Sequence, residues 1–310
     1  MRVGKISLLI LCLSIGLFSC KNDDDGDIPP AQADPPRDRT EVQDEDDAKI
    51  IKYLKSHYYN SDAFGSSNMD PNSSQLVISS VADGNTKLWD DIETLDVTFA
   101  ETNYIIYYLD LNKNVSAEAD SPTFADNVRI LYEGFTLENK TFDSAVTPVN
   151  SDLTTFIPGW GKVLALFKAS SSDAIENGDG TLSFPNHGVG VMFLPSGLAY
   201  FDRSQTGISA YEPIAFKFDL LLTTENDHDN DGVPSYLEDV DDDGDLLNDN
   251  TDNDFDNRTL IQIPNYLDAD DDGDGVLTIN EDINNDGDPT NDIGKNGIPN
   301  YLDPEETASK

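Results

Sequence analysis

The sequence predicts an α+β protein that ends in a long irregular segment. Strand-like stretches rich in β-branched and aromatic residues, separated by Gly and Pro turns, fill residues 128–222. Only two stretches place apolar residues at helical spacing, one near residue 50 and one just after Trp160. After Glu225 the composition changes abruptly to Asp and Asn, which build neither kind of element.

The N-terminal residues 1–19 are predicted to be a signal peptide. Arg2 and Lys5 precede an apolar run, 6–18, which is shorter than the roughly 20 residues of a membrane-spanning helix. The run ends in LFSC, which resembles a bacterial lipobox and implies that Cys20 is acylated and becomes the first mature residue. Ordinary cleavage nearby, leaving Cys20 a free thiol, is the alternative. Cys12 would leave with the signal, so no disulfide is expected.

Residues 20–45 are rich in Asp, Pro, Glu and Gln and predict a disordered acidic tether. The run KNDDDGD, directly after Cys20, resembles a surface-export signal of some Gram-negative lipoproteins, and a plain solvated tether is the alternative. The resemblance implies an outer-membrane lipoprotein of a Gram-negative bacterium, facing the periplasm or the cell surface. The protein would then be anchored in the membrane by the lipid on Cys20. A single acyl chain anchors weakly, but a lipoprotein cysteine carries several.

The next region, 46–102, has no assigned role. Acidic residues followed by Ile50, Leu54 and Tyr58 at helical spacing predict a helix over about 44–58. QLVISSV (75–81) and LDVTFAETNYIIYYLDL (95–111) have strand composition.

Farther along, IAFKFDLLL (214–222) places apolar residues on one face of a predicted strand. The second predicted helix is GKVLALFKAS (161–170). Aromatic and aliphatic residues crowd TFIPGWGKVLALF (155–167), where no serine, cysteine or histidine stands nearby as a nucleophile. An aromatic site without a nucleophile favours a non-covalent function.

Five sequence blocks stand in the order found in FKBP-type peptidyl-prolyl cis-trans isomerases. They are VRILYEGF, KTFDSA, FIPGWGKVL, FLPSGLAYF and GISAYEPIAFKFDLLL. The resemblance covers 103–224 and implies an antiparallel sheet wrapped around one short helix, with a pocket between them. It implies that Trp160 is the floor of the pocket, that the Ile157 backbone N–H and the Tyr200 hydroxyl bind substrate, and that the remaining walls are Tyr132, Phe142, Asp143, Ile208 and Phe216.

Such a site needs no cofactor. Rotation about a peptide bond faces a barrier of about 18–20 kcal/mol because twisting destroys amide resonance. X-Pro bonds populate both isomers and interconvert over tens to hundreds of seconds, so an enzyme has only to bind the twisted imide better than either planar form. The expected partners are proline-containing polypeptides, namely envelope or secreted proteins as they fold.

Three departures from the family pattern favour a second hypothesis, a catalytically silent binding module with a calcium-dependent adhesion or spacer tail. Phe201 stands where the family has glycine, and a pocket phenylalanine is replaced by Val149 or Leu153. An insertion, SSSDAIENGDGTLSFPNHG (170–188), is placed where it is expected to cover or block the pocket. A hydrolase is disfavoured, because no Gly-x-Ser-x-Gly or His-Glu-x-x-His occurs and His187 reads as turn surface.

The net charge of −41 argues against nucleic acid as a partner, since phosphates demand Lys and Arg, and favours metal cations or simply solubility. Residues 225–310 repeat the patterns GVPSYLED, QIPNYLDAD and GIPNYLDPE between Asp-rich loops. Two loops, from Asp227 and from Asp270, place carboxylates at positions 1, 3, 5 and 12 of the EF-hand register, with Gly at position 6. The loop from Asp239 keeps the first three carboxylates and the glycine but ends in Asn250, and a fourth loop offers Asp282, Asn284, Asp286 and Gly287. The predicted metal ligands are Asp227, Asp229, Asp231, Glu238, Asp239, Asp241, Asp243, Asp270, Asp272, Asp274 and Glu281.

Hard oxygen ligands without a Cys or His cluster favour structural Ca²⁺ over zinc, and the lone His228 is expected to face solvent. Paired EF-hands are disfavoured because Pro234, Pro264 and Pro299 interrupt the positions of exiting helices. The pattern resembles thrombospondin type 3 repeats, which wrap around successive calcium ions. A solvated acidic spacer is the alternative. The calcium hypothesis predicts a segment that is loose without the ion and compact with it.

Overall fold

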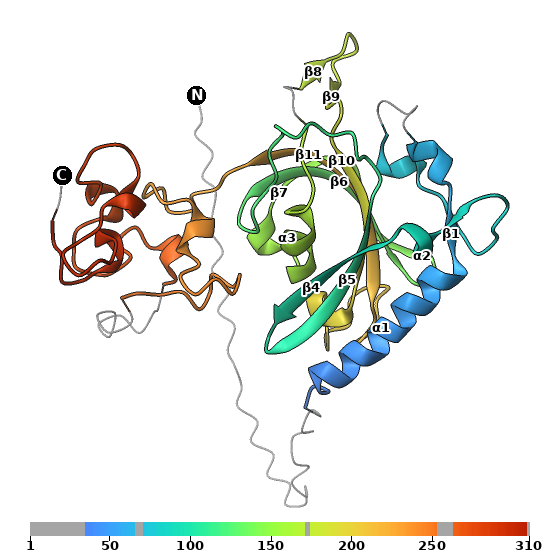
Figure 1. The fold of residues 1–310 in the computed structure, drawn as a ribbon, viewed down its shortest axis with the longest axis horizontal. Coiled ribbons are helices and arrows are strands. Elements are labelled where there is room, and N and C mark those ends of the chain that lie inside the picture. Colours follow the sequence, from blue (N-terminus) through green and yellow to red (C-terminus); the bar gives the residue numbers. More distant parts are fainter. Residues whose placement is uncertain (1–34, 66–70, 171–173, 253–262, 309–310) are drawn as a thin grey trace, which may run out of the picture. The chain divides into compact units, whose positions relative to one another are not determined.

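The computed structural model describes residues 35–65, 71–170, 174–252 and 263–308. The signal peptide, Cys20 and most of the tether lie outside the described residues. Among the described residues, no helix has both the length and the apolar character to cross a bilayer. A six-stranded antiparallel sheet dominates the fold (Figure 1), and its strand order is β4 (Glu93–Phe99), β5 (Thr102–Asp110), β10 (Gly188–Leu194), β11 (Ile214–Thr224), β6 (Asn127–Thr136) and β7 (Thr141–Asp152).

The sheet begins earlier in the chain than residue 103. The predicted strand 95–111 is a hairpin, in which β4 pairs with β5 and Phe99 lies opposite Thr102. The two residues between them, Ala100 and Glu101, have φ values of 46° and 59°. Two consecutive left-handed residues match the twist of a two-residue hairpin, so this turn reverses the chain without glycine.

The short helix α3 (Pro158–Leu164) packs against one face of the sheet. Pro158 is its first residue, a position where the missing N–H costs nothing, so the helix starts three residues before the predicted 161. Trp160, Val163 and Leu164 are buried against the apolar side chains of β10 and β11. The predicted arrangement, an α+β fold with an antiparallel sheet wrapped around one short helix, is confirmed.

A second helix, α1 (Arg39–Ser56), covers the opposite face of the sheet. It buries Ile50, Tyr53 and Leu54 against that face. The central strand β10 is therefore buried throughout, with Val191 and Phe193 facing α1 while alternate residues face α3. The side chain of Asp38 caps the helix by accepting the Glu41 N–H. Residues 39–45, assigned to the disordered tether by their composition, are therefore helical.

Shorter elements complete this part of the chain. Strand β1 pairs with both β2 and β3 in a small antiparallel sheet, so the predicted strand 75–81 is strand only at β2. Strands β8 and β9 form a hairpin within the insertion. The bounds are β1 (Tyr58–Tyr59), η1 (Ser61–Phe64), η2 (Ser73–Gln75), β2 (Ile78–Ser79), β3 (Thr86–Lys87), α2 (Leu88–Asp91), η3 (Leu153–Thr155), β8 (Ile175–Glu176), β9 (Leu182–Ser183) and η4 (Ser196–Leu198).

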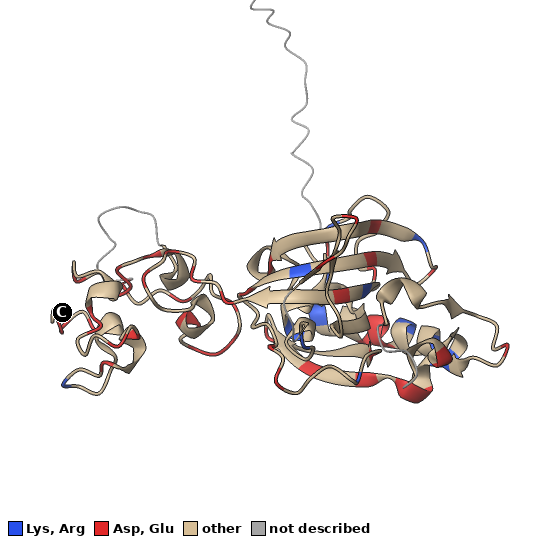
Figure 2. Ribbon diagram, turned by 90° about the horizontal axis from the view of Figure 1, so that it is seen from above, with Lys and Arg blue, Asp and Glu red and all other residues tan. Residues whose placement is uncertain are grey.

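The described part of 225–308 contains no α-helix and no named strand, only short 3₁₀ turns joined by acidic loops (Figure 2). Pro234, Pro264 and Pro299 each stand directly before such a turn and cap it, which gives the sequence repeat a structural counterpart. The irregular C-terminal segment that the sequence predicts is confirmed. Its turns are η5 (Ser235–Glu238), η7 (Asn265–Leu267), η8 (Thr278–Asn280), η9 (Pro289–Asn291) and η10 (Asn300–Leu302).

Stability is expected to fall as the pH rises above about 10, the ordinary tyrosine pKa. Burial raises the pKa of Tyr53, Tyr59 and Tyr107 in the folded protein. The unfolded chain therefore releases these protons first, and alkali favours unfolding. Urea midpoints measured at pH 8, 9, 10 and 11 test this, and Tyr107→Phe is expected to flatten the decline. A midpoint that stays constant to pH 11 would contradict it.

Candidate functional site

The indole of Trp160 lies at the centre of an aromatic cluster on the inner face of the sheet. Its ring centroid is 4.9 Å from that of Phe216, 5.4 Å from Phe156 and 5.9 Å from Phe218. Tyr132 meets it edge-on at 5.8 Å. Only 4% of Trp160 is exposed, so the indole is held in place by Phe156, which lies just before α3, and by rings from the neighbouring strands β6 and β11.

The side chains around this indole are more accessible than the indole itself. Phe142, Tyr132 and Ile157 are half-buried, whereas Ile208 and Phe216 are buried. Phe142 packs edge-on against Phe216 with ring centroids 5.5 Å apart. The cluster therefore has a buried centre, formed by Trp160, Ile208 and Phe216, and a half-buried edge.

Gly134 on β6 makes room for these rings. A methyl group at its Cα would lie 2.6 Å from the rings of both Phe142 and Phe216, closer than carbon atoms approach without displacement. Glycine at this position therefore allows the rings of Phe142 and Phe216 to pack directly against the backbone of β6.

Polar groups are confined to the rim. The Tyr132 hydroxyl donates to Asp143 Oδ2 at 2.8 Å, and burial together with this carboxylate raises the pKa of Tyr132 to about 12. Burial and the charge of Asp143 raise the pKa of Tyr200 as well. Both hydroxyls therefore keep their protons at neutral pH. Ile157 caps α3, so its backbone N–H lies outside the hydrogen bonds of that helix.

The loop after Tyr200 is shaped by Phe201. Phe201 has a φ of 49°, the left-handed region in which glycine is the ordinary residue. Its ring packs edge-on against Tyr211 at 5.2 Å, and the Arg39 guanidinium lies 4.2 Å above it. Contacts to α1 thus support a strained backbone beside the candidate site.

Two aliphatic side chains complete the apolar cluster. Leu153 is buried in the same cluster as Trp160, and Val149 packs against that cluster. Whether either takes the place of a pocket phenylalanine stays a prediction.

The described end of the insertion lies on the face of the sheet opposite Trp160. Neighbouring residues of a strand point to opposite faces, and Phe218 on β11 faces Trp160. Asp219 therefore points the other way, and it accepts from His187 Nε2 at 2.9 Å. The end of the insertion is held on the outer face of the sheet. His187 is buried there, with 7% exposed, which corrects its prediction as turn surface.

Four acidic loops share one backbone geometry. The carboxylates of Asp227, Asp239, Asp270 and Asp282 each accept the N–H of the glycine five residues later. Those glycines, at position 6 of the predicted register, have φ values between 75° and 100°. The loop register read from the sequence is therefore present in the backbone.

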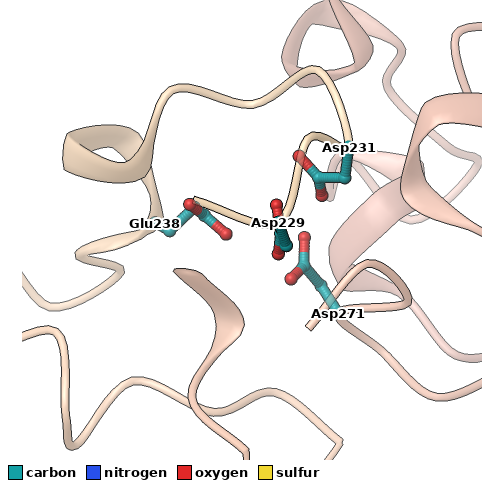
Figure 3. A group of neighbouring side chains, drawn as sticks. All are labelled: Asp229, Asp231, Glu238 and Asp271. Atoms are coloured by element: carbon teal, nitrogen blue, oxygen red, sulfur yellow. The ribbon is translucent and has the colours of Figure 1, made fainter. Parts of the chain in front are cut away.

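Carboxylates of these loops converge in groups. In the largest, one oxygen from each of Asp229, Asp231, Glu238 and Asp271 lies within 4.8 Å of the others (Figure 3). Glu238 is fully buried, and neither of its oxygens has a hydrogen-bond partner among the described residues. Burial and the neighbouring carboxylates raise the pKa of Glu238 to about 9. Burying an ionised carboxylate without a hydrogen-bond partner costs free energy unless a cation lies beside it.

Two further groups lie in the same segment. Asp239 and Asp241 meet Asp249, and Asp270, Asp272 and Asp274 meet one another. Glu281 supplies two more buried oxygens without a hydrogen-bond partner, and its pKa is raised to about 8 by burial and by the carboxylates of the third loop.

Sequence reasoning missed Asp249 and Asp271. Asp249 stands one residue before position 12 of its loop, and Asp271 comes from a different loop. Conversely, the predicted ligands Asp227, Asp243 and Glu281 stand outside these groups. Asp227 uses both oxygens to accept backbone N–H groups, and Asp243 accepts from Asp245 N and Asn248 Nδ2.

His228 does not face solvent as predicted. Its Nε2 lies 2.9 Å from Asp152 Oδ2, and its Nδ1 lies 2.8 Å from Ser235 Oγ. The side chain joins the first acidic loop to the end of β7, which leads through η3 to Trp160.

No family model matches the sequence, and no curated protein matches it. Solved structures do match. A peptidyl-prolyl cis-trans isomerase from Pseudomonas syringae is 14% identical with a TM-score of 0.35, over 62% of this chain and 100% of that one. FkpA from Escherichia coli is 16% identical with a TM-score of 0.32, over 59% of this chain and 63% of that one. At these values the function has to be argued from the site itself.

Proposed function

We propose that this chain is a peptidyl-prolyl cis-trans isomerase that acts on envelope or secreted polypeptides as they fold. The observation that carries the proposal is the buried indole of Trp160 beneath half-exposed aromatic walls, with polar groups only at the rim. The ordered sequence blocks that resemble FKBP-type isomerases support it independently.

The site suits bond rotation because twisting an imide reduces its charge separation. An apolar floor therefore favours the twisted state over either planar form. The Tyr200 hydroxyl and the Ile157 N–H would hold the flanking substrate carbonyls. Asp143 fixes the Tyr132 hydroxyl and positions that wall of the site. These groups lower the barrier without any covalent step.

The direct test is isomerisation of a proline-containing tetrapeptide. The wild type is expected to accelerate it, and Asp143→Ala and Tyr200→Phe are each expected to lower kcat/KM about 10- to 100-fold, as for loss of one oriented hydrogen bond. Glu118→Ala and Tyr58→Phe, which lie outside the cluster, are matched controls. An inactive wild type that still binds the peptide would establish the binding-module hypothesis instead. Activity that neither site variant changes would overturn the site assignment.

We also propose that the C-terminal loops bind structural Ca²⁺. Buried carboxylate oxygens without hydrogen-bond partners, gathered in groups, are the ligands that calcium prefers. Acylation of Cys20, and with it an outer-membrane anchor, is proposed from the lipobox alone.

A further inference from the structure

The largest carboxylate group is built from two loops that are far apart in the sequence. Asp229, Asp231 and Glu238 belong to the first acidic loop, whereas Asp271 belongs to the third. Figure 3 shows the four carboxylates turned toward a common centre. Asp231, Glu238 and Asp271 are each at most 1% exposed, so three members of the group are withdrawn from water.

Asp271 is held in a fixed orientation. Its Oδ2 accepts from the Thr278 hydroxyl at 3.2 Å, while its Oδ1 is buried without a hydrogen-bond partner. One oxygen is thus occupied by its own loop. The other is left for a ligand at the centre of the group.

The neighbours of Asp271 serve a different group. Asp270 and Asp272 meet Asp274 in the third loop, on either side of Asp271 in sequence. A single turn of backbone therefore presents carboxylates alternately to two centres. A ligand bound at either group would hold residues 270–272 in place. It would therefore also position the carboxylates of the other group.

We propose that one divalent cation is bound jointly by Asp229, Asp231, Glu238 and Asp271 and clasps the first acidic loop to the third. Among the described residues, both oxygens of Asp229 and of Glu238 lack hydrogen-bond partners, so the four side chains offer enough oxygens for the six to eight that calcium takes. The clasp deepens the calcium role proposed above and rests on it. Through 270–272 the shared ion makes binding at the third loop cooperative with binding at the first.

The test is Asp271→Asn in the full chain, with Asp242→Asn as a control of equal charge change. Asp242 is exposed and stands outside the carboxylate groups. Calcium titration by calorimetry is expected to show the shared site weakened at least tenfold by Asp271→Asn, and limited proteolysis is expected to show 226–238 and 270–281 losing protection together. Glu238→Gln is expected to give the same result, and the double variant to add little to it.

The clasp also predicts under which condition the variant differs from the wild type. Asp271→Asn should match the protease sensitivity of the wild type in chelator and exceed it in calcium. Loss of a merely structural aspartate would raise the sensitivity under both conditions. If Asp271→Asn binds the same number of ions with affinities within twofold, the clasp is overturned and the calcium role stands. If the wild type binds no calcium, both proposals fail.

Discussion

Replacing Trp160 with alanine is expected to lower the free energy of unfolding by about 3–5 kcal/mol, the usual cost of emptying a buried indole site. The ring contacts Phe156, Phe216 and Phe218 and is almost fully buried, so no neighbour can fill the space without moving. The same change removes the floor of the proposed proline site. Isomerisation of the tetrapeptide is therefore expected to fall to the uncatalysed rate.

A second variant separates folding from function. Trp160→Phe keeps an aromatic floor, and is expected to fold while losing most activity because the smaller ring leaves the site too deep. The chain has two tryptophans, so Trp89→Phe leaves Trp160 as the only indole fluorophore and serves as the control. Urea unfolding followed by fluorescence gives stability, and the tetrapeptide assay gives activity. Full activity in Trp160→Phe would show that the indole is not required.

The sequence predicted this cluster because its residues fall in short blocks with fixed order. The alternation in IAFKFDLLL identifies the inward face of that strand, whereas the start of the helix at Pro158 was placed three residues too late. Seven of the eight predicted side chains lie in or against one apolar cluster, and Asp143 reaches it through its hydrogen bond with Tyr132. Pairing the sequence blocks in one antiparallel sheet brings these residues together.

The start of the N-terminal helix was missed, because the helix was predicted only from about residue 44 and begins at Arg39. Composition alone assigns residues 39–43 to the tether, because charged residues are usually exposed to solvent. The Arg39 guanidinium donates to the Tyr104 hydroxyl at 3.0 Å. This partner lies 65 residues away, so the local sequence could not reveal it.

The carboxylate groups show the same limit. Spacing within a loop identifies Asp229, Asp231 and Glu238, since all three belong to one register. It cannot identify Asp271, which enters by tertiary packing of another loop. Sequence spacing also does not show on which face of the sheet the insertion ends. That position depends on the buried contact between His187 and Asp219.

Removal of calcium is expected to loosen residues 226–308 while the sheet and both helices stay folded. Groups of three and four carboxylates have oxygens within 4.8 Å of one another, and Lys and Arg are scarce in this part of the sequence. Repulsion between unit charges at about 4 Å is roughly 4 kcal/mol per pair at an effective dielectric constant of 20. The apolar contacts of short 3₁₀ turns are too few to oppose that repulsion, so a bound cation decides whether the segment is compact.

Limited proteolysis and circular dichroism in EDTA and in millimolar calcium measure the effect. Cleavage after chelation should concentrate beyond Thr224, while the core around Trp160 keeps its fluorescence. Magnesium at the same ionic strength is the control, because Mg²⁺ demands a near-ideal octahedron, keeps several waters and fits a cage of many carboxylates poorly. Protection restored equally by magnesium would indicate charge screening in place of a site. Identical cleavage with and without calcium would establish the segment as an acidic spacer, because an ion that neutralises buried carboxylates has to change the compactness of the loops that carry them.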